Sequence, residues 1–223
     1  MGKMESSRIS AVVFDMDGVL FDTERLTLIV WKQIAKRHGL ENIEEVYHKA
    51  IGRTTEETKL LVHEAYPDLD VDALYSELRE LMRSTIAEQG LPIKPYSREI
   101  LEALREKKIP LALASSTRYE TVKAQLGMTG YIDYFDVVIG GDMAEHSKPA
   151  PDIYIKACEK LGIAPEKAAA VEDSFNGIRS ASAAGLYTVM VPDILQPDDE
   201  LLKLVDAKCT DLNEAKEHLL GIL

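Results

Sequence analysis

Short runs of apolar, often β-branched residues recur along the chain and are separated by segments long enough to form helices. Five such runs are typical of buried strands: residues 9–14, 109–114, 137–139, 168–171 and 187–191. Between them, apolar residues such as Ile100, Leu101 and Leu104 follow the period of an amphipathic helix. Strands that alternate with helices in this way predict an α/β fold with a doubly wound parallel sheet.

The interval between the first two predicted strands is about ninety residues, far too long for a single crossover connection. Within it, Leu26, Ile29, Val30 and Ile34 recur at helical spacing, and a similar set begins near residue 74. We therefore expect an all-helical cap domain, residues 21–92, inserted into a Rossmann-like α/β core formed by residues 1–20 and 93–223. Additional helices packed on the core would give the same pattern.

Composition and charge narrow the function classes. With 46% apolar and 29% charged residues, the chain has the composition of an ordinary globular protein and not of a disordered one. Its formal net charge of −12 repels polyanions, and no basic cluster offsets it. We expect no nucleic-acid partner and no membrane partner, and a monomer is the default expectation.

Cysteine usage and the N-terminal segment bear on the compartment. Two cysteines, Cys158 and Cys209, are too few for a disulfide framework and are expected to be reduced thiols. The apolar run near the N-terminus is interrupted at Asp15 and Asp17, so it resembles neither a signal peptide nor a membrane span. These features predict a cytoplasmic protein.

Two carboxylates, Asp15 and Asp17, stand at the end of the first predicted strand, and Gly18 follows them. The carboxyl ends of parallel strands are where ligands bind in open α/β sheets. Because two neighbouring acids repel each other, a cation that offsets their charge stabilises the pair, and Mg²⁺ suits an all-oxygen site. A solvated Asp-Gly turn is the alternative for this tetrapeptide considered alone.

Polar residues also follow the other predicted strands. Taken singly, each is accounted for by a helix cap, a surface charge or a turn, but together they would meet at one edge of the sheet. These residues are Ser115, Ser116 and Thr117 after the second strand, Lys148 beyond the third, and Glu172 and Asp173 at the end of the fourth. Ser115, Ser116 and Thr117 precede a predicted helix, where their hydroxyl and amide groups can hold a phosphate.

This set of residues suits phosphoryl transfer. Asp15 would attack phosphorus to form an aspartyl-phosphate, while Asp17 protonates the leaving oxygen and later deprotonates the attacking water. Glu172 and Asp173, with Asp15, would hold Mg²⁺. The ion, Lys148 and the Ser115 hydroxyl would then offset the charge of the transferring group.

The motifs resemble those of the haloacid dehalogenase superfamily, in its branch of small phosphatases and phosphomutases. They are FDMDGVLFDTE at 14–24, ASST at 114–117, SKPAPD at 147–152 and VEDS at 171–174, in the family's order. The resemblance implies that Asp15 is the nucleophile, Asp17 the acid/base, and Ser115 and Lys148 the phosphate ligands. It implies Mg²⁺ ligation by Asp15, Asp173 and the Asp17 carbonyl.

The resemblance also assigns roles that the residues alone do not. Glu172 would bind the metal directly or through water, and Thr23 would position the acid/base. The inserted helices correspond to the family's cap, whose loop at Gly52 and Arg53 would contact the substrate. A solvated surface arginine is the alternative for Arg53. Trp31 is interpreted as cap core and not as a stacking platform.

Particular residues separate the chemistries of this superfamily. Dehalogenases lack the second aspartate, which is present here as Asp17. β-Phosphoglucomutases carry a histidine where this chain has Thr27, and a cap lysine where it has Arg79 and Arg83. Both departures favour a phosphatase acting on a small phosphate ester, such as a sugar phosphate.

Three alternatives to the phosphatase stay open. The first is a β-phosphoglucomutase-type mutase. The others come from a different class: a receiver-like phosphate acceptor and an inactive binding module. Receiver domains use the end of the third strand for their acceptor, whereas this chain presents its aspartates after the first, and every motif position of an active enzyme is filled.

Overall fold

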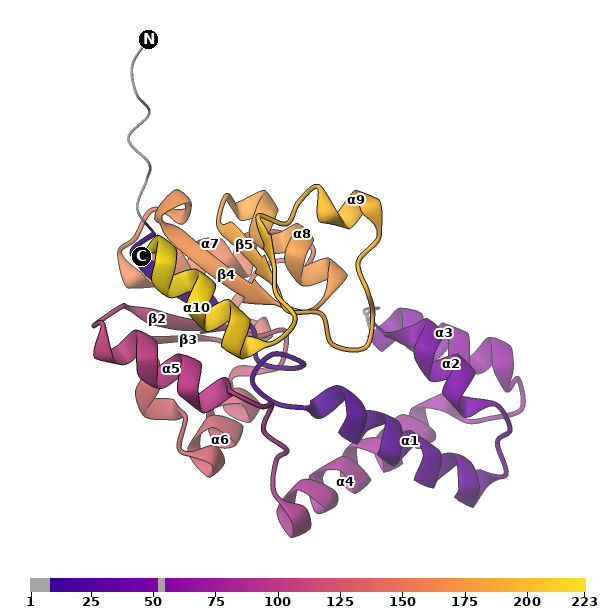
Figure 1. Ribbon diagram of the computed structural model, residues 1–223. Helices are drawn as coiled ribbons and strands as arrows, with labels where there is room; N and C mark the ends of the chain where they lie inside the picture. The colour runs from indigo at the N-terminus through magenta and orange to yellow at the C-terminus, as the bar shows by residue number, and fades with distance from the viewer. Residues whose placement is uncertain (1–8, 52–54) are drawn as a thin grey trace. The chain divides into compact units, whose positions relative to one another are not determined.

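A computed structural model describes residues 9–51 and 55–223 of the chain (Figure 1). The chain divides into two compact units: a core unit of Met1–Phe21 and Ile93–Leu223, and a cap unit of Asp22–Pro92. The sequence pattern predicts Phe21 as the first residue of the cap, but Phe21 lies in the core unit. Its wholly buried ring lies 5.6 Å from the Tyr131 ring, and its backbone forms a bridge with Ile93.

The core unit is built on a six-stranded, entirely parallel sheet with the order β3-β2-β1-β4-β5-β6. The strands are β1 (Ala11–Phe14), β2 (Leu111–Ala114), β3 (Val137–Ile139), β4 (Ala168–Glu172), β5 (Tyr187–Met190) and β6 (Ala207–Lys208). The α/β class with a parallel sheet is confirmed. The sixth strand was not predicted, because its two residues are too few to produce a periodic pattern.

The strand order places β1 at the point where the chain reverses its direction of winding. Val13 of β1 pairs with Ala112 of β2 on one side and with Ala170 of β4 on the other. From β1 the chain moves outward through β2 to β3, and then returns to β4 on the opposite side. Such a switch point opens a ligand crevice at the carboxyl ends of the strands, so the residues that follow β1 and β4 lie at the expected binding position.

Helices cover both faces of the sheet. They are α5 (Ser97–Glu106), α6 (Tyr119–Thr129), α7 (Asp152–Leu161), α8 (Phe175–Ala184), α9 (Asp199–Leu202) and α10 (Leu212–Ile222), with short 3₁₀ turns η1 (Ile132–Tyr134), η2 (Gly141–Met143) and η3 (Pro165–Lys167). α7 contacts β1, β2 and β3, α8 contacts β4 and β5, and α5 and α10 contact each other on the face turned toward the viewer in Figure 1.

The face under α7 is lined by small side chains. Alternate positions of β1, β2 and β4 belong to one buried cluster with α7, and most of these positions are alanines, including Ala114 and Ala170. Successive strand residues point to opposite faces, so every second residue contributes to this layer. Small strand residues leave volume for a large helix residue, and Tyr154 of α7 is wholly buried there.

The described residues of the cap unit form four helices. They are α1 (Thr23–His38), α2 (Ile43–Ala50), α3 (Thr55–Ala65) and α4 (Val71–Gln89). Their buried faces form a separate core that includes Trp31, whose ring lies 5.7 Å from the Tyr47 ring. The helical spacing predicts Ile29 on the apolar face of the first helix, but Ile29 is 50% exposed. Among the described residues, no helix is both long enough and apolar enough to cross a membrane.

Both cysteine thiols are expected to be unreactive in the native protein. Burial raises the pKa of Cys158 and of Cys209 to about 11, and both side chains are buried. Because the thiolate is the reactive form, Ellman's reagent at pH 8 should titrate neither thiol in the folded protein and both thiols after denaturation in guanidinium chloride. A thiol of the native protein that reacts as fast as free glutathione would contradict this prediction.

Candidate active site

The turn that follows β1 brings its carboxylates to the end of β4. The Asp15 N–H donates to the Val171 carbonyl at 3.0 Å, so strand pairing continues through Asp15. Gly18 has φ of +82°, and a Cβ there would lie 2.2 Å from Oδ2 of Asp173. Glycine is therefore required for two reasons: the backbone conformation and the close approach of the Asp173 carboxylate.

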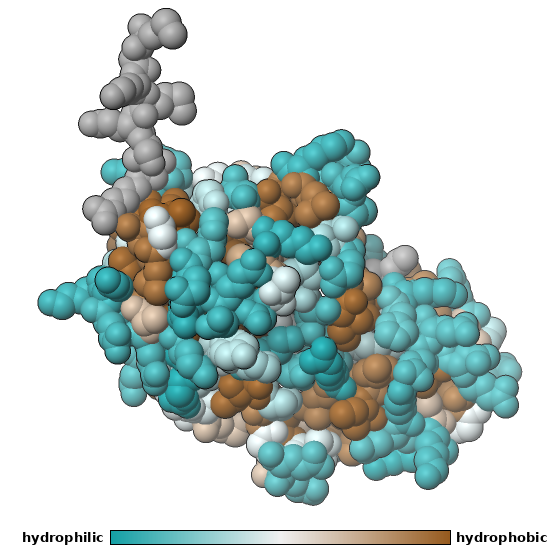
Figure 2. All heavy atoms as spheres, in the orientation of Figure 1, coloured by the Kyte–Doolittle hydropathy of each residue, from teal (hydrophilic) through white to brown (hydrophobic). Residues whose placement is uncertain are grey.

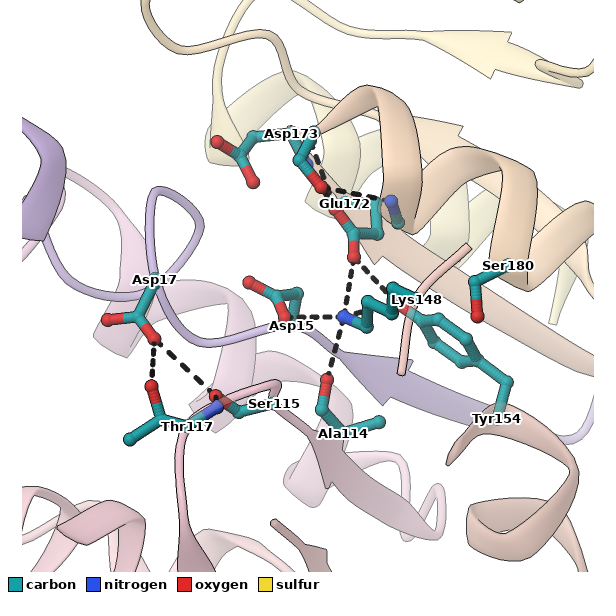
Figure 3. Close-up of polar contacts among 12 residues, drawn as sticks. Asp15, Asp17, Ala114, Ser115, Thr117, Lys148, Tyr154, Glu172, Asp173 and Ser180 are labelled. Carbon is teal, nitrogen blue, oxygen red and sulfur yellow. Dashed lines mark hydrogen bonds and ion pairs between the residues drawn. The ribbon is translucent and has the colours of Figure 1, made fainter. Parts of the chain in front are cut away.

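Lys148 is the centre of a buried hydrogen-bond network (Figure 3). Its Nζ donates to Oδ1 of Asp15 at 2.6 Å, to Oε1 of Glu172 at 2.7 Å and to the Ala114 carbonyl at 3.0 Å. A lysine ammonium has three hydrogens, and these three acceptors use all of them. Lys148, which follows β3 in the chain, thus forms hydrogen bonds to residues at the ends of β1, β2 and β4.

Burial and charge act against each other in this network. Burial disfavours the Lys148 ammonium, but the carboxylates of Asp15 and Glu172 outweigh that effect and hold the pKa of Lys148 well above its ordinary value. Burial also raises the pKa of Asp15 to about 8, assisted by the charges of Glu172 and Asp17 and opposed by Lys148. Several carboxylates and a single ammonium therefore meet at this site, and the neighbouring carboxylates disfavour ionisation of Asp15.

Glu172 is fully buried and both of its carboxylate oxygens accept hydrogen bonds. Oε2 accepts from the Asp173 N–H, the Ser174 N–H and the Ser174 hydroxyl, each at 3.0 Å. Ser174 also caps α8 by accepting from the Gly177 N–H. A Cβ at Gly177 would lie 1.7 Å from Oε1 of Glu172, so this position too requires glycine.

Tyr154 is a member of this network that the sequence did not reveal. Its hydroxyl donates to Oε1 of Glu172 at 2.9 Å and lies 3.4 Å from Nζ of Lys148. Burial, followed by the charge of Glu172, raises the pKa of Tyr154 well above its ordinary value, so the phenol keeps its proton. Tyr154 thus supplies a permanent donor to Glu172.

Asp17 points away from the lysine network and toward the segment after β2 (Figure 3). The Thr117 hydroxyl donates to Oδ2 of Asp17 at 2.9 Å, and the Ser115 hydroxyl lies 3.4 Å from the same oxygen. The Ser115 hydroxyl itself accepts from the Thr117 N–H at 3.0 Å. Asp15 and Asp17 therefore have different environments although one residue separates them.

Three acids of this site fit a divalent metal ion. Asp15, Glu172 and Asp173 each offer a carboxylate oxygen, and these oxygens lie within 4.8 Å of one another. An all-oxygen donor set with excess negative charge suits a hard cation such as Mg²⁺. Because Gly18 has no side chain, the Asp173 carboxylate can lie directly against the turn that follows β1.

The structure brings together most, but not all, of the residues predicted for the site. Asp15, Asp17, Ser115, Lys148, Glu172 and Asp173 lie at one edge of the core sheet (Figure 3). Ser116 follows Ser115 but its side chain is exposed. Thr23 is the first residue of α1 in the cap unit, so its predicted role stays a prediction. Gly52 and Arg53 lie outside the described residues.

The sequence does not predict Tyr154 as a site residue, and it does not predict the contact of Thr117 with Asp17. Tyr154 has helical apolar spacing with Ile153 and Ala157, so it was assigned to the buried face of its helix, and nothing in the sequence shows that its hydroxyl reaches Glu172. Thr117 is predicted, with Ser115 and Ser116, as a polar residue after the second strand that could hold a phosphate. Its bond to Asp17 depends on how the segments after β1 and β2 approach each other.

Comparison with known proteins agrees with this geometry. A family model described as haloacid dehalogenase-like hydrolase matches residues 9–185. A phosphorylated carbohydrates phosphatase of Thermotoga maritima is 33% identical over 81% of this chain and 84% of its own. A fructose-1-phosphate phosphatase of Escherichia coli is 28% identical over 82% of this chain and 97% of its own.

Solved structures share the whole architecture. The crystal structure of a protein from Thermotoga maritima, described as a putative beta-phosphoglucomutase, superposes with a TM-score of 0.82 at 31% identity. The match covers 96% of this chain and 100% of that chain. Both the core and the helical insertion are therefore represented in that structure.

Replacement of Tyr154 by phenylalanine should destabilise the protein. The substitution removes one donor from the buried Glu172 carboxylate, which costs about 1–3 kcal/mol in the free energy of unfolding. Urea denaturation followed by circular dichroism measures this loss. Tyr134→Phe is the matched control, because its hydroxyl bonds are exposed and its loss should stay below about 0.5 kcal/mol. Equal losses in the two variants would contradict the prediction.

Added Mg²⁺ should raise the melting temperature, because a ligand that binds only the native state stabilises it. At a hundred times its dissociation constant, we expect a rise of about 5–10 °C, measured by differential scanning fluorimetry against NaCl of equal ionic strength. Asp173→Asn should remove most of this rise, while Asp133→Asn, an exposed aspartate, should keep it. A rise of the same size in the Asp173 variant would exclude Asp173 as a ligand.

Proposed function

The chain belongs to the haloacid dehalogenase-like hydrolases, in their branch of phosphatases and β-phosphoglucomutase-like proteins, and we propose that it is a Mg²⁺-dependent phosphatase of a small phosphorylated carbohydrate. The single observation that carries the proposal is the network in which Lys148 binds Asp15 at 2.6 Å beside a cluster of three carboxylates. The names of the two phosphatase relatives support the substrate class.

In the proposed mechanism Asp15 is the nucleophile. Lys148 binds Oδ1, and the other carboxylate oxygen attacks phosphorus, forming an O–P bond while the bond to the leaving oxygen breaks. The Lys148 ammonium favours the ionised carboxylate, which is the nucleophilic form. When bound at Asp15, Glu172 and Asp173, Mg²⁺ would supply further positive charge that favours ionised Asp15 and offsets charge on the phosphoryl oxygens.

Asp17 is proposed as the acid and base of the two half-reactions. It gives its proton to the leaving oxygen in the first step, and it takes a proton from the attacking water in the second, when the Asp15–phosphorus bond breaks and inorganic phosphate forms. The Thr117 hydroxyl donates to one carboxylate oxygen of Asp17 at 2.9 Å and so fixes the orientation of the carboxyl group. Asp17 can thus transfer protons at the leaving oxygen and at the attacking water while Asp15 forms and breaks the bond to phosphorus.

The remaining core residues hold the phosphoryl group in this proposal. The Ser115 hydroxyl is buried and lies between Asp17 and the Thr117 amide, so it is placed to bind a phosphoryl oxygen. Ser116 is exposed and would contribute its hydroxyl or amide only to a bound ligand. Lys148 and Ser115 together offset the charge that develops in the transition state.

The cap unit is proposed to select the substrate, and one of its residues favours hydrolysis over mutase chemistry. Thr27 occupies the position where β-phosphoglucomutases carry a histidine. Its hydroxyl donates to the Thr23 carbonyl at 2.7 Å. A threonine hydroxyl neither gains nor loses a proton near neutral pH, whereas an imidazole does. The resemblance to a putative beta-phosphoglucomutase keeps the mutase as the second candidate.

Asp15→Asn should reduce the turnover number about a thousandfold or more, because the amide cannot form the phosphoenzyme. The assay measures inorganic phosphate released from a panel of sugar phosphates in the presence of Mg²⁺, with and without glucose 1,6-bisphosphate. Asp133→Asn serves as the matched control and should retain full activity, because its side chain is exposed and far along the chain from every motif.

Two outcomes would overturn the proposed function. Isomerised sugar phosphate without phosphate release would identify a mutase. Phosphate release by Asp15→Asn at the wild-type rate would place the nucleophile on another residue.

A further inference from the structure

All three hydrogens of the Lys148 ammonium are directed at acceptors of the protein itself. They point to Oδ1 of Asp15 at 2.6 Å, to Oε1 of Glu172 at 2.7 Å and to the Ala114 carbonyl at 3.0 Å. The proposed function nevertheless requires Lys148 to bind an oxygen of the phosphoryl group. One of the three acceptors therefore has to be released when a phosphoryl group arrives.

The release of a buried acceptor is costly unless another donor replaces the ammonium. Glu172 is wholly buried, and an acceptor that loses its donor away from water retains the full cost of its desolvation. Asp15 has to stay bound to Lys148, because its ionised form is the proposed nucleophile. The acceptor that can be released at low cost is one that keeps a second donor.

Tyr154 provides a second donor for Glu172. Its hydroxyl lies 2.9 Å from Oε1, the same oxygen that accepts from Lys148. Because an ammonium accepts no hydrogen bond, the phenol proton cannot point to Lys148 and is directed at the carboxylate. The other oxygen, Oε2, accepts from two backbone amides and one hydroxyl independently of Lys148. After the ammonium leaves, Glu172 thus keeps one donor on Oε1 and three on Oε2.

The Tyr154 hydroxyl is held in place independently of the lysine (Figure 3). Tyr154 is wholly buried on α7, in the cluster formed with the alanines of the strands. The centroid of its ring lies 4.9 Å from Nζ of Lys148, so the ring attracts the ammonium without taking one of its hydrogens. Replacement of the tyrosine by phenylalanine keeps this ring and removes only the donor to Glu172.

We propose that Tyr154 is a positioning residue for phosphoryl transfer, which holds Glu172 in place while Lys148 turns one hydrogen from Glu172 to the incoming phosphoryl group. The inference rests on the proposed function and names the residue that compensates for the redirected hydrogen bond. Tyr154 acts through Glu172 and Lys148 and not on the reacting atoms. No proton is transferred in this step, because Lys148 stays an ammonium and Glu172 stays a carboxylate.

Binding of orthovanadate, an analogue of the transferring phosphoryl group, tests the proposal without turnover. In Tyr154→Phe, the turn of Lys148 toward the ligand would leave Oε1 of Glu172 with no donor from the tyrosine or the lysine. The dissociation constant for orthovanadate should therefore rise about tenfold or more, as measured by isothermal titration calorimetry with Mg²⁺ well below the melting temperature. The value of kcat/KM for a hydrolysed sugar phosphate should fall by a similar factor.

Tyr131→Phe is the matched control for a purely structural role. Tyr131 is also wholly buried in the core unit, and its hydroxyl forms a buried hydrogen bond of 2.8 Å with Ser97. Both variants lose one buried hydroxyl and should lose similar stability in urea. Tyr131→Phe should nevertheless bind orthovanadate within about twofold of the wild type. Equal weakening in the two variants would overturn the proposal.

The response to the metal excludes a second explanation. Tyr154→Phe should keep the rise in melting temperature that Mg²⁺ causes in the wild type. A loss of that rise in Tyr154→Phe would assign the weaker orthovanadate binding to the metal site and overturn the proposal.

A crystal structure of the wild type with Mg²⁺ and orthovanadate would show the redirected hydrogen bond. Nζ of Lys148 should contact Oδ1 of Asp15 and a vanadate oxygen, and should lie more than roughly 3.5 Å from Oε1 of Glu172. The Tyr154 hydroxyl should stay within hydrogen-bond distance of Oε1. A lysine that keeps Glu172 and releases Asp15 or the Ala114 carbonyl would contradict the proposal.

The outcomes separate this inference from the proposed function. If the wild type releases phosphate from no ester and does not bind orthovanadate, the phosphatase proposal fails. If the wild type does both and Tyr154→Phe equals it in both, the phosphatase proposal stands and only the role of Tyr154 is overturned.

Discussion

The core of this protein depends on a buried ammonium that has to be neutralised. Isolating a charge from water costs several kcal/mol, so Lys148 is stable only because Asp15, Glu172 and the Ala114 carbonyl accept all three of its hydrogens. Those acceptors lie at the ends of three different strands, and therefore the correct sheet order is a condition for satisfying the charge. The same contacts that satisfy the lysine also orient the proposed nucleophile, so stability and chemistry share one set of hydrogen bonds.

Space for this network comes from residues with little or no side chain. Alanines on β2 and β4 leave volume for Tyr154, whose hydroxyl completes the shell of Glu172. Glycines do the same in the turn after β1 and in the first turn of α8, because any side chain at Gly18 or Gly177 would overlap a carboxylate. The polar site is thus surrounded by positions where a larger residue would displace an acid, and the arrangement of acids is maintained by backbone contacts and not by side-chain packing alone.

The two units divide the proposed tasks by their chemistry. The core unit offers charged groups in a fixed frame of parallel strands, which suits a phosphoryl group that is the same in every substrate. The cap unit is proposed to select the organic part of the substrate, which varies. Because the cap has its own buried cluster around Trp31, that cluster is stabilised by contacts other than the lysine network of the core.

The sequence by itself determined the parallel α/β class, the helical insertion and the positions of Asp15, Asp17, Ser115, Lys148, Glu172 and Asp173, because strand periodicity and the motifs after each strand are local patterns. Tertiary structure decided what local patterns do not encode: the sixth strand of two residues, the place of Phe21 in the core and the exposure of Ile29. It also decided the partners of Tyr154 and Thr117, which lie 18 and 100 residues away along the chain. A hydroxyl in an amphipathic pattern has the same appearance whether it faces solvent or a buried acid, and only the packing of distant segments distinguishes the two.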